Sequence, residues 1–292
     1  MEDNLNEVPL VFNTRTTPFA SRDTDQIVYD KAERRGGLKA KITKQFLKEP
    51  ELLIIESLQR YTFLNANMIG IILERDIGYP KASIKQILSR MTKGRMITRF
   101  RVTYTDAFDK EHRSSYIYTL GDNIFNKGNI ELLSRTAYSY LAFNQFHIAV
   151  NQKYRSNMTG YYCKGRDTID GSVSFTSEGK RVTLNVVTIR KGIEAGMHTN
   201  DVLRNAVKGD RVKGTLLILC ESELHALEIE RYRKMIDEQK EIRVFYMCDH
   251  ATAGESMPFE NVVRIKNEKE YEIVTIPVDD ISPKVNTESQ NE

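Results

Sequence analysis

The sequence has too few cysteines for a protein built on disulfides, and its apolar runs are too short for a membrane-spanning protein. Its three cysteines, Cys163, Cys220 and Cys248, form an odd number without a CxxC pair, which argues against a disulfide framework. Apolar runs such as 216–220 are far shorter than the roughly 20 residues that cross a bilayer. The N-terminus is acidic where a signal peptide is basic. We therefore expect a soluble cytoplasmic protein with no membrane partner.

Common enzyme motifs are also missing. The chain has no GxGxxG, P-loop or GxSxG sequence, and no Ser/His/Asp or Cys/His triad can be argued from spacing. His147 is a lone histidine in an apolar run, so we expect it to be packed or capping. These absences predict no cofactor and no catalytic residues.

The composition is that of a folded protein with an uneven charge. The 292 residues are 40% hydrophobic and 28% charged, which suits a globular chain of about two domains. The net charge of +3 is the sum of +5 over residues 1–120, +5 over 121–212 and −7 over 213–292. Such segregation hints at one end that binds a polyanion and another with a different role.

Residues 50–120 show a readable order of helices and strands. Apolar residues at helical spacing predict three helices, 50–61, 66–76 and about 81–92. Asn65 or Asn67 can cap the second helix, and Gly94 stands where a left-handed residue would end the third. Alternating residues then predict two strands, 96–102 and 114–120. Three helices followed by a β-hairpin is the order of a winged helix-turn-helix.

The remaining chain predicts a second domain of the α/β class. Strands are expected near 168–175, 181–189, 214–220 and 242–248, with helices at 193–208 and after a cap at Ser222. A strand, helix and strand at this spacing imply a parallel pair. The fold class is therefore a two-domain α+β or α/β protein. The expected parts are a flexible N-terminal segment (1–37), a winged-helix DNA-binding domain (38–121), a helical linker (122–160), an α/β domain (161–285) and a tail (286–292).

Charge placement is the strongest functional signal. No acidic residue occurs in the 29 positions from Ile77 to Thr105. Basic and amide side chains on the third helix suit the major groove, and arginines beside the wing suit phosphate or the minor groove. The alternative is an ordinary solvated basic face. The predicted DNA-binding residues are Lys81, Ser83, Lys85, Gln86, Ser89, Arg90, Lys93, Arg95, Arg99 and Arg101.

A second pattern is similar to a degraded nuclease motif. The restriction-endonuclease-like fold carries an acid and then an acid-x-Lys on adjacent strands, which together hold Mg²⁺. Asp170 suits the first acid, but Asn185 and Val187 stand where the second acid and the lysine belong. Glu178 and Lys180 read as acid-x-Lys in a hairpin turn that faces solvent. We expect this domain to be inactive.

Two cysteines and two histidines of the second domain could either bind a metal ion or be ordinary packed side chains. Cys220, His225, Cys248 and His250 are zinc-ligand types, but their spacing matches no known zinc knuckle, so we expect small buried side chains and no metal.

The helical run 131–153 has more large apolar residues than one face buries within a domain: Leu132, Leu133, Tyr138, Tyr140, Leu141, Phe143 and Phe146. That surplus predicts a homodimer, and packing against the α/β domain is the alternative.

The chain resembles the replication-relaxation family of Gram-positive plasmids and mobile elements. The resemblance rests on the winged helix at about 50–120, its closure at 118–121, the helix with 147–151, and Asp170-Gly171 before a long strand. It implies double-stranded DNA binding at an origin of replication or transfer, or at a promoter, with a relaxase or replication initiator as a possible partner. The alternatives are a transcriptional regulator with a sensing α/β domain and a Mg²⁺-dependent nuclease or nicking subunit.

Overall fold

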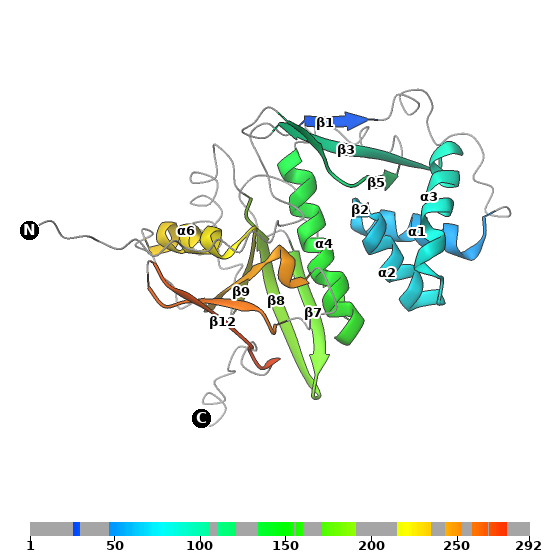
Figure 1. The fold of residues 1–292 in the computed structure, drawn as a ribbon. Helices are drawn as coiled ribbons and strands as arrows, with labels where there is room; N and C mark the ends of the chain where they lie inside the picture. Colours follow the sequence, from blue (N-terminus) through cyan, green and yellow to red (C-terminus); the bar gives the residue numbers. More distant parts are fainter. Residues whose placement is uncertain are drawn as a thin grey trace, which may run out of the picture.

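The chain folds into an α+β protein with two β-sheets (Figure 1). The computed structural model describes residues 26–29, 47–105, 110–120, 134–154, 156–159, 171–190, 215–234, 243–252, 259–267 and 269–278. The helix expected at 193–208, the acid Asp170, the apolar residues Leu132 and Leu133, and the tail at 286–292 lie outside these ranges. Among the described helices, none combines the length and apolar character needed to cross a membrane.

The first unit consists of residues 47–120 and one separate strand. Its elements are α1 (Glu49–Tyr61), β2 (Leu64–Asn65), α2 (Ala66–Ile77), the 3-10 helix η3 (Lys81–Ser83), α3 (Ile84–Lys93), β3 (Ile97–Thr105), β4 (Glu111–Arg113) and β5 (Ile117–Leu120). The antiparallel sheet has the order β1-β3-β5-β2, and β4 pairs with β3. The three helices expected from the sequence are present. The second expected strand, 114–120, contains β5, whereas β4 lies just before it and is not among the expected strands.

Strand β1 (Gln26–Tyr29) corrects the expectation for the N-terminal segment 1–37. It pairs antiparallel with β3, with Gln26 opposite Thr103 and Tyr29 opposite Phe100. The free edge of β3 offers backbone donors and acceptors, and a four-residue segment is enough to take them up. Such pairing between distant segments leaves no mark in the local sequence pattern.

Short-range signals set the ends of the helices. Pro50 lies in the first turn of α1, where its missing N–H costs no helical hydrogen bond. The Asn65 side chain accepts from the Met68 N–H at 2.9 Å and caps α2. Gly78 ends α2 with φ 64° in the left-handed region. The cap at Asn65 confirms one of the two expected alternatives.

The end of α3 differs from the sequence expectation by one residue. Gly94 has φ −75°, and Arg95 takes the left-handed conformation with φ 55°. The Met96 N–H bonds to the Met91 carbonyl at 2.9 Å, which closes the helix around Arg95. A side chain at positive φ costs about 1–2 kcal/mol, so this turn is held by its surroundings and not by residue preference.

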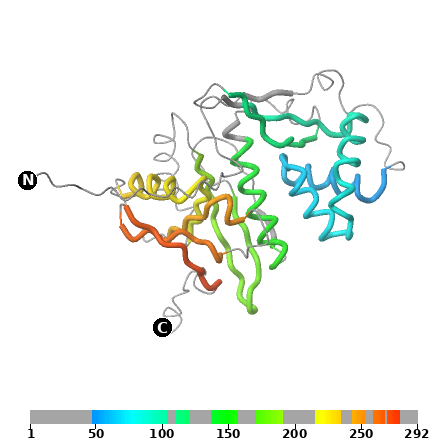
Figure 2. Tube along the Cα trace, viewed as in Figure 1, coloured from blue at the N-terminus to red at the C-terminus, as the bar shows by residue number. Residues whose placement is uncertain are grey.

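Helix α4 (Ser134–Tyr154) is a buried helix that contacts both parts of the molecule. It runs between the first unit and the second sheet, as the tube in Figure 2 shows in green, and every residue from Tyr140 to Val150 is buried. Tyr138, Tyr140 and Leu141 pack with the first unit, whereas Phe143 and Phe146 pack with the second sheet. Within the linker expected at 122–160, the described residues 134–154 are therefore a core element, and 157–159 form a strand, β6 (Asn157–Thr159). Packing within one chain covers the described apolar residues that predicted a dimer, so the dimer prediction loses that support.

The second sheet has seven strands that follow the chain order β12-β11-β10-β9-β8-β7-β6. Its other strands are β7 (Gly171–Ser177), β8 (Lys180–Thr188), β9 (Thr215–Cys220), β10 (Arg243–Cys248), β11 (Val262–Ile265) and β12 (Tyr271–Val274). Strands β8, β9 and β10 are parallel, which confirms the expected parallel pair, and the other neighbours are antiparallel. Helix α4 packs on one face, and α6 (Glu223–Lys234) packs on the other (Figure 1).

Neighbouring polar residues of α4 bind the two units to each other. The Asn144 Nδ2 group donates to the carbonyls of Tyr61 and Phe63 at 2.9 and 2.7 Å. The Gln145 Nε2 group donates to the Asp249 carbonyl and the Thr252 hydroxyl, both at 2.8 Å, within the 3-10 helix η4 (Asp249–Thr252). Because these groups are buried, each bond satisfies an atom that would otherwise lose its water partner.

His147 continues this junction towards the first unit. Its Nδ1 atom lies 2.9 Å from the Tyr61 hydroxyl, and its side chain is fully buried. Burial, followed by the nearby cations Arg60 and Arg75, lowers the pKa of His147 to about 3. The histidine is therefore neutral at pH 7, and the sequence-based expectation that it is packed is confirmed.

Candidate nucleic-acid interface

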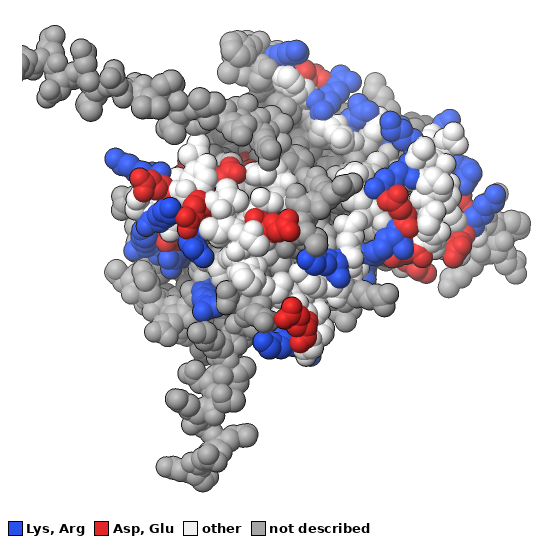
Figure 3. Space-filling model, turned by 60° about the horizontal axis from the view of Figure 1, so that its bottom comes forward, with Lys and Arg blue, Asp and Glu red and all other residues white. Residues whose placement is uncertain are grey.

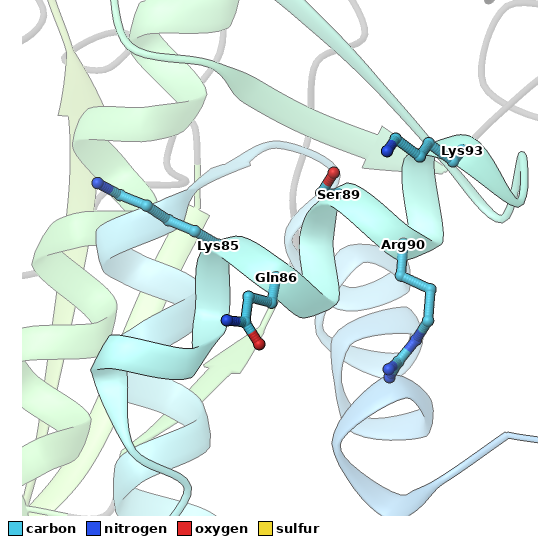
Figure 4. A pocket seen from close by; sticks show the side chains of 5 residues that line it. All are labelled: Lys85, Gln86, Ser89, Arg90 and Lys93. Carbon is cyan, nitrogen blue, oxygen red and sulfur yellow. The ribbon is translucent and has the colours of Figure 1, made fainter.

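Helix α3 has one buried face and one exposed face. Ile84, Ile87, Leu88 and Met91 are between 0% and 4% exposed and join the core of the first unit. The opposite face presents an open hollow lined by five side chains of the helix (Figure 4): Lys85, Gln86, Ser89, Arg90 and Lys93. All five belong to the predicted DNA-binding set, so the helical period alone places them on one surface.

Two of the predicted basic residues are held by acids of the same unit. The Arg90 Nη2 atom lies 2.6 Å from Glu51 Oε1 in α1, and Figure 4 shows the side chain turned towards that helix. Glu51 is itself buried and also accepts from the Lys48 N–H at 2.8 Å. The Lys81 ammonium group lies 2.8 Å from Glu74 Oε2. The main role of Arg90 is therefore to pair with Glu51 and join α3 to α1, and the charge of Lys81 is partly neutralised by Glu74.

Other basic residues of this surface have no such partner. Within the described part of the chain, Lys85, Lys93 and Arg95 form no salt bridge, and all three are exposed. Gln86 is exposed beside Lys85, and Ser83 and Ser89 are half-buried. The exposed set of Lys85, Gln86, Lys93 and Arg95, here called the α3 surface, combines charge with an amide that can both donate and accept hydrogen bonds.

The wing arginines lie against an aromatic ring. The guanidinium carbons of Arg99 and Arg101 lie 4.1 and 3.6 Å from the centroid of the Tyr116 ring. Both arginines are half-buried on β3. A cation–π contact of this kind is worth about 0.5–2 kcal/mol, so the two side chains have a role in stabilising the wing. Their predicted contact with DNA requires them to leave this ring or to act through their remaining exposed atoms.

The face in Figure 3 shows how the charges are distributed. On the right-hand half, which holds the first unit, blue side chains are spread widely with red ones between some of them. The first unit contains two ion pairs of this kind, Arg90 with Glu51 and Lys81 with Glu74. The acid-free stretch of sequence is thus only partly an acid-free surface, because α1 and α2 contribute carboxylates to it.

Gly70 fixes how closely α3 approaches α2. A methyl group at Gly70 would lie 2.7 Å from Ile84 Cδ1 and 3.6 Å from Lys81 Cγ. Gly70→Ala is therefore expected to lower the free energy of unfolding by about 1–2 kcal/mol, although alanine favours helices by up to about 1 kcal/mol. Urea unfolding of the full chain measures the change. In an Ile84→Val background, which removes the contacting Cδ1, Gly70→Ala should cost less, and an equal cost in both backgrounds would contradict this packing.

The nuclease-like pattern has no acid on the two strands that would carry it. Asn185 of β8 lies half-buried opposite Ser172, whose hydroxyl donates to Asn185 Oδ1 at 3.0 Å. Glu178 and Lys180 flank the exposed turn between β7 and β8, as expected, with Glu178 at φ 49°. At this position on β8, in place of the second acid, the described strand offers Mg²⁺ the amide oxygen of Asn185, which is a weak ligand for this ion.

The cysteine and histidine residues are brought together in part. The Cys220 and Cys248 sulfurs are 3.9 Å apart, whereas the His225 Nδ1 atom accepts from the Glu221 N–H at 3.3 Å. A group of three possible ligands forms instead from Glu223, Cys248 and His250. Glu223 is not among the residues predicted from the sequence, although its place in the first turn after the Ser222 cap is a signal for it.

Comparison of the chain with protein-family models, with curated proteins and with solved structures found no match. The resemblance to the replication-relaxation family therefore stays a prediction from the sequence.

Proposed function

We propose that this protein binds double-stranded DNA through α3 and the β3–β5 wing. The observation that carries the proposal is the α3 surface, where Lys85, Gln86, Lys93 and Arg95 are exposed on the second helix of a closely packed helix pair. The order of one helix, a two-residue strand, two further helices and an antiparallel wing supports a winged helix-turn-helix domain. In such domains the second helix of the pair enters the major groove.

The side chains of the α3 surface divide into two roles. Lys85 and Gln86 project from the first half of the helix, where a guanine or adenine edge is within reach. Lys93 and Arg95 lie at its end and suit the phosphate backbone. We assign phosphate contact to these two and base contact to the first two.

The biological setting of this binding rests on the family resemblance. It implies a protein of a plasmid or mobile element that acts at an origin of replication or transfer or at a promoter, with a relaxase or replication initiator as partner. The α/β unit then serves as a scaffold or partner surface, and the weak ligand set at Asn185 supports a role without nucleic-acid cleavage.

DNA binding is expected to depend on salt, and loss of either predicted phosphate contact is expected to weaken binding to all DNA sequences alike. Fluorescence anisotropy of the full chain with a labelled random-sequence duplex should show affinity that falls steeply between 50 and 200 mM salt. Lys93→Ala and Arg95→Ala should each reduce the slope of log K against log salt by about 0.9, because each removes one phosphate contact. Gln86→Ala should instead reduce the preference for sites selected from a randomised pool, by about 1–3 kcal/mol per affected base pair.

Lys269→Ala is the matched control. It removes the same charge from an exposed position between β11 and β12, far along the chain from α3, and should leave both affinity and slope unchanged. Absence of binding to any duplex of the pool at 50 mM salt would refute the proposal. Equal losses in Lys269→Ala and Lys93→Ala would mean that net charge, and not α3, governs binding.

A further inference from the structure

Two parallel strands end at a pair of facing cysteines. Cys220 and Cys248 are the last residues of β9 and β10 and are register partners. Both side chains are buried, at 0% and 1% exposed, and their sulfurs are 3.9 Å apart. Ligands of α/β proteins commonly bind beyond the carboxyl ends of parallel strands, where the next helices begin.

Two more metal-ligand types come to the same edge from the elements that follow these strands. Glu223 is the first residue of α6, and His250 is the second residue of η4. The His250 Nε2 atom lies 3.2 Å from Glu223 Oε1, and the two side chains are 21% and 24% exposed. The ligand atoms of Glu223, Cys248 and His250 all lie within 4.8 Å of one another.

We propose that Cys248, His250 and Glu223 bind a zinc ion at this edge of the sheet. A thiolate, an imidazole and a carboxylate are the borderline donors that Zn²⁺ accepts, and three protein ligands leave one position for water. The proposal is independent of DNA binding, because none of the three residues belongs to the first unit.

The distances are close to those of a tetrahedral site. With bonds of about 2.0–2.3 Å, neighbouring ligand atoms of a tetrahedron are about 3.3–3.8 Å apart. The pair of His250 and Glu223, at 3.2 Å, is close to this range, and the other distances within the group are at most 4.8 Å, so binding requires only a side-chain rotation to shorten them. Cys220 Sγ lies outside the group of three but beside Cys248, and it bonds to the Met247 carbonyl at 3.6 Å. It is therefore a neighbour of the site and not one of the three ligands.

Charge and access also suit a divalent ion. A Cys248 thiolate and the Glu223 carboxylate together carry two negative charges, which Zn²⁺ neutralises at a largely buried position. The partial exposure of Glu223 and His250 gives the ion a path from solvent. Without metal, the hydrogen bond with Cys220 and burial raise the pKa of Cys248 well above its ordinary value. Metal binding must therefore displace the thiol proton, so affinity rises with pH.

Cobalt titration of the chelator-treated full chain tests the site. Co²⁺ takes the same ligands as Zn²⁺ and gains a thiolate charge-transfer absorption when a cysteine binds it. We expect one Co²⁺ per chain, that absorption band, its loss on addition of Zn²⁺, and release of protons. A chain that binds no Co²⁺, or binds it without the thiolate band, overturns the proposal.

Single variants assign the ligands. His250→Ala and Glu223→Gln should weaken binding by more than the roughly 10–100-fold that loss of an outer partner costs, and Cys248→Ala should abolish the thiolate band. Glu228→Gln, at an exposed site one turn further along α6, and Cys220→Ala should both retain one metal per chain. Unchanged affinity in His250→Ala and Glu223→Gln, or loss only in Cys220→Ala, overturns the assignment. Thermal unfolding of each metal-free variant establishes that it is folded before titration.

Discussion

Arg190→Met is expected to destabilise the protein by about 3–5 kcal/mol. The Arg190 Nη1 atom lies 2.5 Å from Asp249 Oδ2, and both side chains are 0% exposed. Removal of the guanidinium leaves the Asp249 charge buried without its ion pair, and charges in the interior are costly unless compensated. The loss should appear in urea unfolding as a lower midpoint at an unchanged slope.

A double-mutant cycle separates the pair from its surroundings. Asp249→Asn alone should also cost about 3–5 kcal/mol, whereas Arg190→Met combined with Asp249→Asn should cost much less than the sum, because no unpaired charge remains. The exposed pair of Arg113 and Glu111, whose Nε and Oε1 atoms are 2.8 Å apart, is the control, and its loss should cost no more than about 1 kcal/mol. Additive effects of Arg190→Met and Asp249→Asn would show that the buried pair is not coupled.

The elements of the first unit could be predicted because their signals are local. The proline at the start of α1, the cap at Asn65 and the apolar stripe of α3 all lie within one or two turns of the structure that they determine. One error arose where distant segments meet, because β1 pairs with a strand more than 70 positions away. The other is a local shift by one residue: Arg95 takes the left-handed conformation in place of Gly94, and the Met96 N–H bonds back to Met91.

The candidate interface divides in the same way. The helical period predicts which residues of α3 face outwards, and the structure agrees for the five that line its hollow. It gives no information on which of them have partners, since Glu51 meets Arg90 across 39 positions of sequence. The ring contacts of Arg99 and Arg101 with Tyr116 likewise depend on the pairing of β3 with β5.

The hydrogen bonds that join the two units cannot be predicted from the sequence for a similar reason. Asn144 and Gln145 are adjacent polar residues in an apolar helix, and nothing local says that one faces each unit. Their partners lie 83 and 104 positions away. The apolar residues of α4 predict a surplus of apolar surface, whereas in the structure two different cores divide that surface between them.

Acid is expected to destabilise the fold through His147. Its pKa is about 3 in the folded protein, against about 6.5 in an unfolded chain. Between these values the unfolded chain binds a proton that the folded chain does not, so stability is lost as the pH falls through 6.5. The loss from this residue is about 2 kcal/mol at pH 5 and on the order of 5 kcal/mol near pH 3.

The variant His147→Gln isolates this contribution, because glutamine does not titrate and can still bond to the Tyr61 hydroxyl. Urea unfolding at pH 7 and pH 5 should show that the variant loses about 2 kcal/mol less on acidification than the native chain, whatever its stability at pH 7. His112→Gln is the matched control for the substitution itself, because His112 lies half-buried on β4 of the wing, outside the junction. Equal pH dependence of the native chain and His147→Gln would mean that the histidine takes up its proton in the folded state, and that the contact between α4 and Tyr61 opens before the rest of the protein unfolds.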